Sequence, residues 1–167
     1  THGSTYKMAV HGDNGWHDRI PAYATRVVQN EQTKDYSAQF WAPAEQFDWQ
    51  GDAFDTKQLG SLLIYEAHVG MAQEKADVGT YREFTRKILP KIRRAGYNAV
   101  QLMAVAEHPY YGSFGYHVSN FYAPSSRFGT PEELKELIRT AHSMGLAVIM
   151  DVVHAHYVKN FNEGLRE

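Results

Sequence analysis

Three apolar segments alternate with two helix-forming segments over residues 62–153, and this alternation constrains the fold more than any other feature. The apolar segments are Leu62–Ala67, Asn98–Met103 and Ala147–Val153, almost unbroken runs of the kind found in strands buried on both faces. Parallel strands joined by right-handed helical crossovers are the usual solution for this order. The pattern therefore predicts an α/β fold, either a closed barrel or an open doubly wound sheet.

A capping box marks the start of each helical segment. Thr80 and Glu83 have the spacing at which a hydroxyl and a carboxylate bond each other's backbone amides, and Thr130 and Glu133 repeat it. Pro90 removes one backbone donor inside the first helix and should bend it. The residues expected on the buried helix faces are Phe84, Ile88 and Ile92, then Leu134, Leu137, Ile138 and Ala141.

Residues 1–57 differ from the rest, because short β-prone runs alternate there with turn residues. We predict the last strands of a small β module, with an irregular connector over residues 42–58 and a domain boundary near Lys57, so that the second domain spans residues 58–167. The chain starts at Thr1 without a signal sequence, and we interpret it as a piece of a longer protein. The predicted strands are Tyr6–Val10, Ala24–Val28 and Ser37–Trp41.

Composition excludes several classes of partner. With 17 basic and 19 acidic side chains, a net charge of −2 and no basic stripe, the chain is not expected to bind nucleic acid. There is no cysteine, no apolar run long enough to span a membrane, and no glycine-rich phosphate loop. We expect a cytoplasmic protein that binds neither membranes nor nucleotides.

Ligands gather at the carboxyl ends of the strands in both candidate architectures. His68 follows the first strand, whereas Asp151, His154 and His156 follow the third. The connection after the second strand, residues 104–129, far exceeds the roughly 2–6 residues usual for such loops. Its aromatic residues beside hydrogen-bonding groups suit a sugar ring, although packing beneath a long loop explains them equally well. These aromatic residues are Tyr110, Tyr111, Phe114, Tyr116, Phe121, Tyr122 and Phe128.

Alternative interpretations exist for the residues after the third strand. Asp151 fits a site residue or a turn cap. His154 and His156 would share a face if the strand continued, as in the metal sites of some barrel hydrolases. However, hydrogen-bonding histidines are commoner than metal ligands, and no further ligand has suitable spacing. We expect neither a metal nor a cofactor.

Asp151–His156 resembles the first signature region of the α-amylase family. Further landmarks resemble the glycogen and starch branching enzymes of that family, the eukaryotic-like subgroup most closely, over essentially the whole chain. These landmarks are Tyr65–Gly70, Gly96–Met103, Glu107–Tyr111, Ser113–Tyr116 and Ser126–Leu134, with Ile20–Ala24 and Phe40–Pro43 in the first domain.

The resemblance implies the first three βα units of a (β/α)8 barrel, preceded by the end of a β-sandwich carbohydrate-binding module. It implies retaining transglycosylation, in which an α-1,4-glucan segment passes through a covalent glycosyl-enzyme to a glucan 6-hydroxyl. The family's two reactive carboxylates, and a third that stabilises the transition state, follow later strands, so no catalytic residue is expected here and the 167 residues alone should be inactive. The implied partners are glycogen, amylose and maltooligosaccharides.

The same resemblance implies four substrate-binding residues. His156 should hydrogen-bond the glucose beside the cleaved bond, Tyr116 should stack on that ring, and Asp151 should orient the site; Tyr111 completes the set. Ala155 departs from the family pattern at a position where many amylases have a calcium ligand, which argues against calcium. Two other functions stay open, a glucan-binding module without chemistry and a metal-dependent hydrolase.

Three strands of a closed barrel would leave two unpaired edges and bare apolar faces. We therefore predict that the chain self-associates through these edges or faces. Sedimentation should show an oligomer that dissociates on dilution. A strictly monomeric species that melts cooperatively would contradict this prediction.

Overall fold

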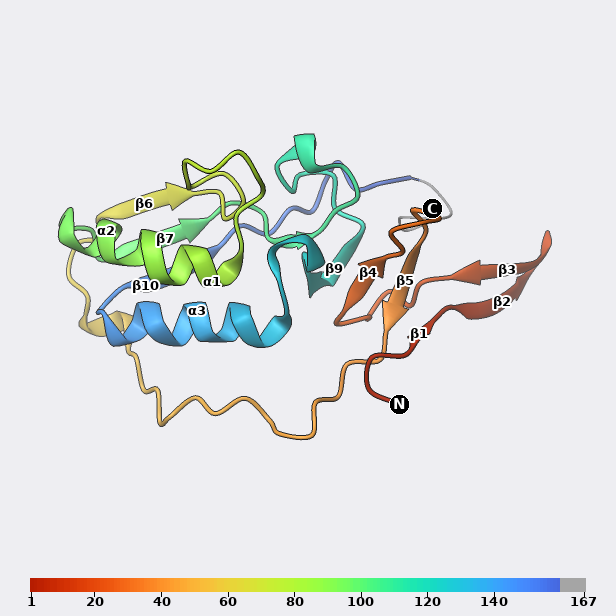
Figure 1. Ribbon diagram of the computed structural model, residues 1–167, viewed down its shortest axis with the longest axis horizontal. Helices are drawn as coiled ribbons and strands as arrows, with labels where there is room; N and C mark the ends of the chain where they lie inside the picture. The colour runs from red at the N-terminus through yellow and green to blue at the C-terminus, as the bar shows by residue number, and fades with distance from the viewer. Residues whose placement is uncertain (160–167) are drawn as a thin grey trace. The chain divides into compact units, whose positions relative to one another are not determined.

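The computed structural model of the chain describes residues 1–159 (Figure 1). Its backbone divides into two compact units. Unit 1 contains Thr1–Glu45, Ala106–Ser126 and the chain from Val153, and unit 2 contains Gln46–Val105 and Arg127–Val152. The long connection after the second strand therefore belongs largely to unit 1. The module boundary near Lys57 stays a prediction.

Unit 2 is built on a parallel three-stranded sheet in the order β10-β7-β6. The strands are β6 (Ile64–Ala67), β7 (Ala99–Leu102) and β10 (Ala147–Met150). All three predicted strands are present, and their parallel pairing is confirmed. The extension of the third strand to Val153 is wrong, because β10 ends at Met150, opposite the last residue of β7.

The first helical segment changes its hydrogen-bonding pattern near Pro90. It consists of α1 (Tyr81–Glu83), a π-helical turn η2 (Phe84–Ile88) and α2 (Leu89–Arg94). The Leu89 amide donates to the Phe84 carbonyl, a bond that spans five residues. Pro90 lies in the first turn of α2, where its missing N–H does least harm. The predicted face is confirmed, since Phe84, Ile88 and Ile92 are buried.

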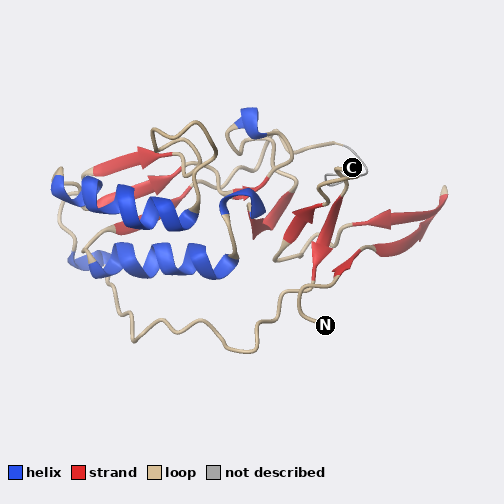
Figure 2. Ribbon diagram, viewed as in Figure 1, coloured by secondary structure: helices blue, strands red, loops and turns tan. Residues whose placement is uncertain are grey.

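The second helix is α3 (Pro131–Ser143), which begins at a complete capping box. The Glu133 amide donates to the Thr130 hydroxyl at 3.2 Å, and the Thr130 amide donates to the Glu133 carboxylate at 2.9 Å. Both helical segments lie against the sheet (Figure 2), and α3 buries Leu134, Leu137 and Ala141. Within residues 1–159, no helix has the length and apolar character needed to cross a bilayer.

The Glu83 carboxylate fixes the loop between β6 and α1. Besides capping the Thr80 amide, it accepts a hydrogen bond from Gln73 at 3.0 Å and pairs with the Lys75 ammonium at 2.8 Å. These hydrogen bonds and the adjacent positive charge lower the pKa of Glu83 to about 2, despite the opposing effect of desolvation. The carboxylate is thus ionised at every ordinary pH.

Unit 1 contains two antiparallel sheets in its first 45 residues. One has the order β1-β5-β4, with β1 (Thr5–Tyr6), β5 (Tyr36–Gln39) and β4 (Val27–Gln29). The other is a hairpin of β2 (Met8–Gly12) and β3 (Gly15–Arg19). The predicted run Tyr6–Val10 is therefore divided between two strands. The core of the first sheet consists of Ala24, Val27, Tyr36, Ala38 and Ala123, with Ile20 packed against it.

Ala123 comes from the long connection, which folds upon itself. The connection contains β8 (Ala106–Glu107), η3 (Tyr111–Ser113), β9 (Asn120–Pro124) and η4 (Ser126–Phe128), and β8 pairs antiparallel with β9. Glu107 is only 1% exposed, and its carboxylate accepts a hydrogen bond from the Ser126 amide at 2.7 Å. Its carbonyl accepts two more, from the amide and the hydroxyl of Ser119. One buried residue thus joins the two ends of the connection.

Several apolar side chains of unit 2 are exposed beside the sheet. Within the described part of the chain, β6 and β10 are the edge strands. This exposure is compatible with self-association, which stays a prediction. The exposed residues, from 43% to 67%, are Leu62, Leu63, Ile64, Met150 and Val152.

Replacing Glu107 should destabilise the long connection. In Glu107→Gln an amide NH2 would replace one carboxylate oxygen and face the backbone N–H of His108 or of Ser126. We expect the free energy of unfolding, measured with urea, to fall by about 1–3 kcal/mol. Glu31→Gln, at an exposed turn of the same unit, should change it by no more than about 0.5 kcal/mol. Equal effects of the two substitutions would contradict this role.

Stability should depend on Glu83 in a defined pH window. Its pKa is lowered in the folded chain from an ordinary 4.5 to about 2, so its stabilising effect is complete above pH 4.5 and lost as the pH falls towards 2. The melting temperature of Glu83→Gln should lie below that of the original chain at neutral pH, and the difference should shrink across this window. Glu74→Gln, in the exposed part of the same loop, should show no such pH-dependent difference.

Candidate functional site

The carboxyl ends of β6, β7 and β10 lie at one level in unit 2. Leu102 pairs with Ala67 on one side and with Met150 on the other, so the residues after each strand emerge at the same edge. Two backbone bonds extend this register by one step, from the Met103 amide to Ala67 and from the Asp151 amide to Leu102. His68 and Asp151 therefore occupy equivalent positions after the two outer strands.

Asp151 is held in place by the central strand. The Gln101 side-chain amide donates to Asp151 Oδ1 at 2.7 Å, and the Asp151 side chain is half-buried. Gln101 and Asp151 are 50 residues apart, so only the parallel pairing of β7 with β10 brings them together. The arrangement gives a carboxylate of fixed orientation at the edge where ligands of parallel sheets bind.

His68 is buried at the same edge, with 6% exposure. Its Nδ1 accepts a hydrogen bond from the Gly70 amide at 3.1 Å, and its ring packs edge-on against Phe128 with centroids 5.6 Å apart. Because Nδ1 is an acceptor here, the neutral ring carries its proton on Nε2 and can donate from that atom. The sequence marked His68 as an edge residue but not as a substrate-binding one.

Tyr111 and Tyr116 lie on a tight turn of unit 1. Tyr111 begins η3, and both side chains are half-buried. The Phe114 amide donates to the Tyr111 carbonyl and the Tyr116 amide to the Ser113 carbonyl, each at 3.0 Å. The backbone of Phe114 has a φ of 55°, in the left-handed region that a bulky residue rarely adopts. The turn fixes the spacing between the two tyrosines.

His154 and His156 lie beyond the strand, and both are exposed. His156 has a φ of 63°, so the two histidines do not share a strand face as a metal pair would require. Among residues 1–159, no group of three or more His, Asp or Glu side chains is arranged to hold a metal ion. The Val158 amide donates to the Val118 carbonyl at 2.9 Å, which joins the segment carrying His156 to the connection carrying Tyr116.

The four predicted substrate-binding residues are thus divided between the units. Tyr111, Tyr116 and His156 belong to unit 1, whereas Asp151 belongs to unit 2 with Gln101 and His68. Sequence reasoning missed Gln101, because its importance comes from a partner that is distant in sequence. It also gave no structural role to Glu107, which holds together the connection that carries the tyrosines.

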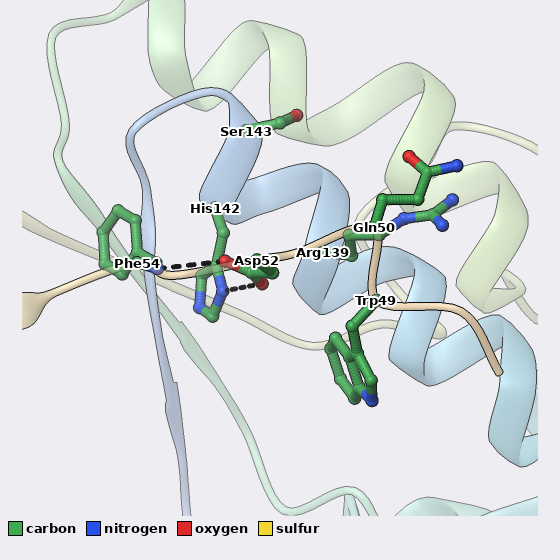
Figure 3. A pocket seen from close by; sticks show the side chains of 7 residues that line it. All are labelled: Trp49, Gln50, Asp52, Phe54, Arg139, His142 and Ser143. Atoms are coloured by element: carbon green, nitrogen blue, oxygen red, sulfur yellow. Dashed lines mark hydrogen bonds and ion pairs between the residues drawn. The ribbon is translucent and has the colours of Figure 1, made fainter.

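A hollow of about 210 Å³ lies elsewhere in unit 2, between the connector and α3 (Figure 3). Asp52 Oδ2 lies 2.6 Å from His142 Nδ1, and the His142 ring is stacked on Phe54 with centroids 4.4 Å apart. The hydrogen bond from His142 lowers the pKa of Asp52 below its ordinary value. The hollow is lined by Trp49, Gln50, Asp52, Phe54, Arg139, His142 and Ser143.

Curated relatives of the chain are 1,4-alpha-glucan-branching enzymes. The enzyme of Yarrowia lipolytica is 52% identical, with 98% of this chain and 24% of the relative aligned. That of Dictyostelium discoideum is 48% identical over 99% of this chain and 24% of the relative, and that of Aspergillus oryzae is 53% identical over 88% and 22%. The predicted resemblance is confirmed. The chain spans about a quarter of the length of these relatives.

Two solved structures have a similar fold. A Salmonella typhimurium protein described as an alpha amylase superposes with a TM-score of 0.75 at 26% identity, covering 97% of this chain and 26% of the other. A pullulanase from Anoxybacillus sp. LM18-11 gives a TM-score of 0.64 at 20% identity over 93% of this chain and 26% of that one, which shows likeness of fold alone.

A family model for the alpha amylase catalytic domain matches residues 51–164. Together with the amylase superposition, this match shows that the α/β fold is TIM-barrel-like. The match includes the whole of β6, β7 and β10 and the edge residues His68 and Asp151. The chain therefore belongs to the alpha-amylase family, and residues 51–164 are part of its catalytic domain.

Proposed function

We propose that this chain is part of a 1,4-alpha-glucan-branching enzyme, which cleaves an α-1,4 glucan and transfers the severed segment to a glucan 6-hydroxyl. The observation that carries the proposal is identity of about 50% to curated branching enzymes over nearly the whole chain. The substrates would be glycogen, amylose and maltooligosaccharides. The reaction would proceed through a covalent glycosyl-enzyme with retention of the anomeric configuration.

In this proposal, unit 2 supplies the first three βα units of a (β/α)8 barrel. The parallel order β10-β7-β6 with intervening helices supports this assignment. The antiparallel strands of residues 1–45 would be the end of a β-sandwich carbohydrate-binding module, with the boundary near Lys57. The two small sheets formed by residues 1–45 are compatible with such an end.

Four residues would contact the glucan. Tyr116 would stack on the glucose ring beside the cleaved bond, and Tyr111 on the same turn would also contact the glucan. His156 would donate a hydrogen bond to that glucose. Asp151 would orient the site, and its bond from Gln101 supports this role because the carboxylate has a fixed direction. His68, buried at the same edge, is a further candidate donor.

The resemblance supports two further parts of the proposal. The 167 residues alone would transfer no glucan, because the family's reactive carboxylates follow barrel strands that come after the third. The reaction needs no cofactor and no metal, since the two carboxylates supply the nucleophile and the acid. A cytoplasmic setting is proposed from the absence of cysteine.

A chimera tests the function and the site together. The chain would replace the aligned quarter of the Yarrowia lipolytica enzyme, and branching would be followed by loss of amylose–iodine absorbance and growth of the α-1,6 anomeric NMR signal. We expect an active chimera. His156→Asn should lower kcat/KM roughly 10- to 100-fold, because an unreplaced hydrogen bond costs about 1–3 kcal/mol.

Asparagine suits this test because it tolerates the left-handed backbone of His156, so a loss of activity would not reflect strain. His154→Asn, at a neighbouring exposed position, is the matched control and should keep full activity. Full activity in both variants would remove His156 from the site while leaving the function intact. A folded chimera that binds maltoheptaose but forms no branches would instead favour a binding module without chemistry.

A further inference from the structure

We propose that the hollow between the connector and α3 is a binding site for one glucosyl unit of an α-glucan chain. Residues 46–58 of the connector belong to unit 2 together with α3. The inference rests on the proposed function for its ligand, a glucan, but the site itself is separate from the residues named above.

The hollow has the size and surface of a sugar site. Its volume of about 210 Å³ is below the roughly 300–1,000 Å³ of sites for drug-sized ligands, so it suits a single ring. Trp49 is 39% exposed at the rim, although a tryptophan is usually well buried. Its flat indole can cover the apolar C–H face of a pyranose, and Phe54 supplies a second apolar surface.

Residues with hydrogen-bonding side chains also line the hollow. Among residues 1–159, the side-chain amide of Gln50 and the indole N–H of Trp49 make no hydrogen bond. Arg139 uses Nη1 to donate to the Asp48 carbonyl at 2.7 Å, which fixes its guanidinium while leaving further N–H groups at the hollow. Gln50 and Arg139 both line the hollow, one from the connector and the other from α3 (Figure 3). Hydroxyl groups of a sugar match such a set of donors and acceptors.

The charge of the hollow favours a neutral ligand. Asp52 and Arg139 both line the hollow, and the bond to His142 fixes the orientation of the Asp52 carboxylate. A phosphate would be attracted by the cation of Arg139 but repelled by the negative charge of Asp52. A glucose unit carries no charge, so neither Asp52 nor Arg139 repels it. The charges at the hollow thus favour a neutral sugar over an anion as the ligand.

The backbone of the connector is strained at this position. Gln50 has a φ of 52° and Gly51 a φ of 67°, and the Asp52 amide donates to the Trp49 carbonyl at 3.0 Å. These features define a tight turn with two left-handed central residues, where glycine or asparagine is preferred at the first. Glutamine is costly there, yet the turn places Gln50 at the hollow that Arg139 also lines. Strained residues of this kind are typical of binding sites.

The site lies at the end of unit 2 opposite to Asp151. Arg139, His142 and Ser143 belong to the last turns of α3, and the chain then enters β10 at its amino end, with the Leu146 amide bonded to Ala141. Asp151 follows the carboxyl end of the same strand. Substitutions at the two places can therefore be tested independently.

The test is a titration of the chain with maltotriose, followed through the indole N–H NMR signal of Trp49. We expect this signal to shift and saturate. Trp49→Ala should weaken binding about tenfold or more, because the apolar contact with the ring is lost. Gln50→Gly should weaken it roughly three- to tenfold through loss of the amide, while the melting temperature stays equal or rises, because glycine relieves the left-handed strain.

If Gln50→Gly lowers the affinity for maltotriose without lowering the melting temperature, Gln50 has a binding role and not a structural one. Trp16→Ala, at an indole that is 71% exposed in unit 1, is the matched control and should leave affinity unchanged. The proposal is overturned if the Trp49 signal stays still, if both variants bind normally, or if inorganic phosphate moves the signal and maltotriose does not. An active branching chimera without a Trp49 shift would reject this site alone, whereas a shift with an inactive chimera would reject the branching function alone.

Discussion

The central position of β7 is the constraint on which unit 2 depends. Each residue of β7 pairs with β6 on one side and with β10 on the other, in the same register. Asn98 fixes this register at the amino end: its side chain bonds the backbone of Leu63 and Ser61, and its carbonyl accepts from the Ala147 amide. Because the strands start level, they also end level, which places His68 and Asp151 at one edge. A slip of one residue would turn the side chains of a strand to the opposite face.

Features specified by neighbouring residues were predicted well. The capping boxes at Thr80 and Thr130 and the buried helix faces depend on residues three or four positions apart, which a sequence displays directly. Strand ends were predicted less well. Val152 and Val153 are as apolar as the residues of β10, but a strand ends where its partner ends, and β7 stops at Leu102.

The candidate site also depends on contacts between residues that are distant in sequence, which a sequence does not display. The resemblance to branching enzymes supplied Tyr111, Tyr116, Asp151 and His156, whereas the groups that fix their surroundings come from distant parts of the chain. Gln101 reaches Asp151 across 50 residues, and Glu107 reaches Ser126 across 19. No local pattern marks either pair. The hollow at Trp49 likewise requires an irregular segment to lie on a helix that follows it by some 90 residues.

The π-helical turn η2 determines how the helices of unit 2 tolerate changes in length. A π turn accommodates one residue more than an α turn without rotating the helix beyond it. Deleting one residue between Phe84 and Ile88 would thus remove the extra residue of this turn and leave Ile92 facing inward, although Pro90 would still interrupt the hydrogen-bond ladder. The same deletion early in α3, which has no such turn, would rotate the rest of that helix by about 100° and take Leu137 and Ala141 out of the core. A one-residue deletion should therefore disturb the core less within η2 than early in α3.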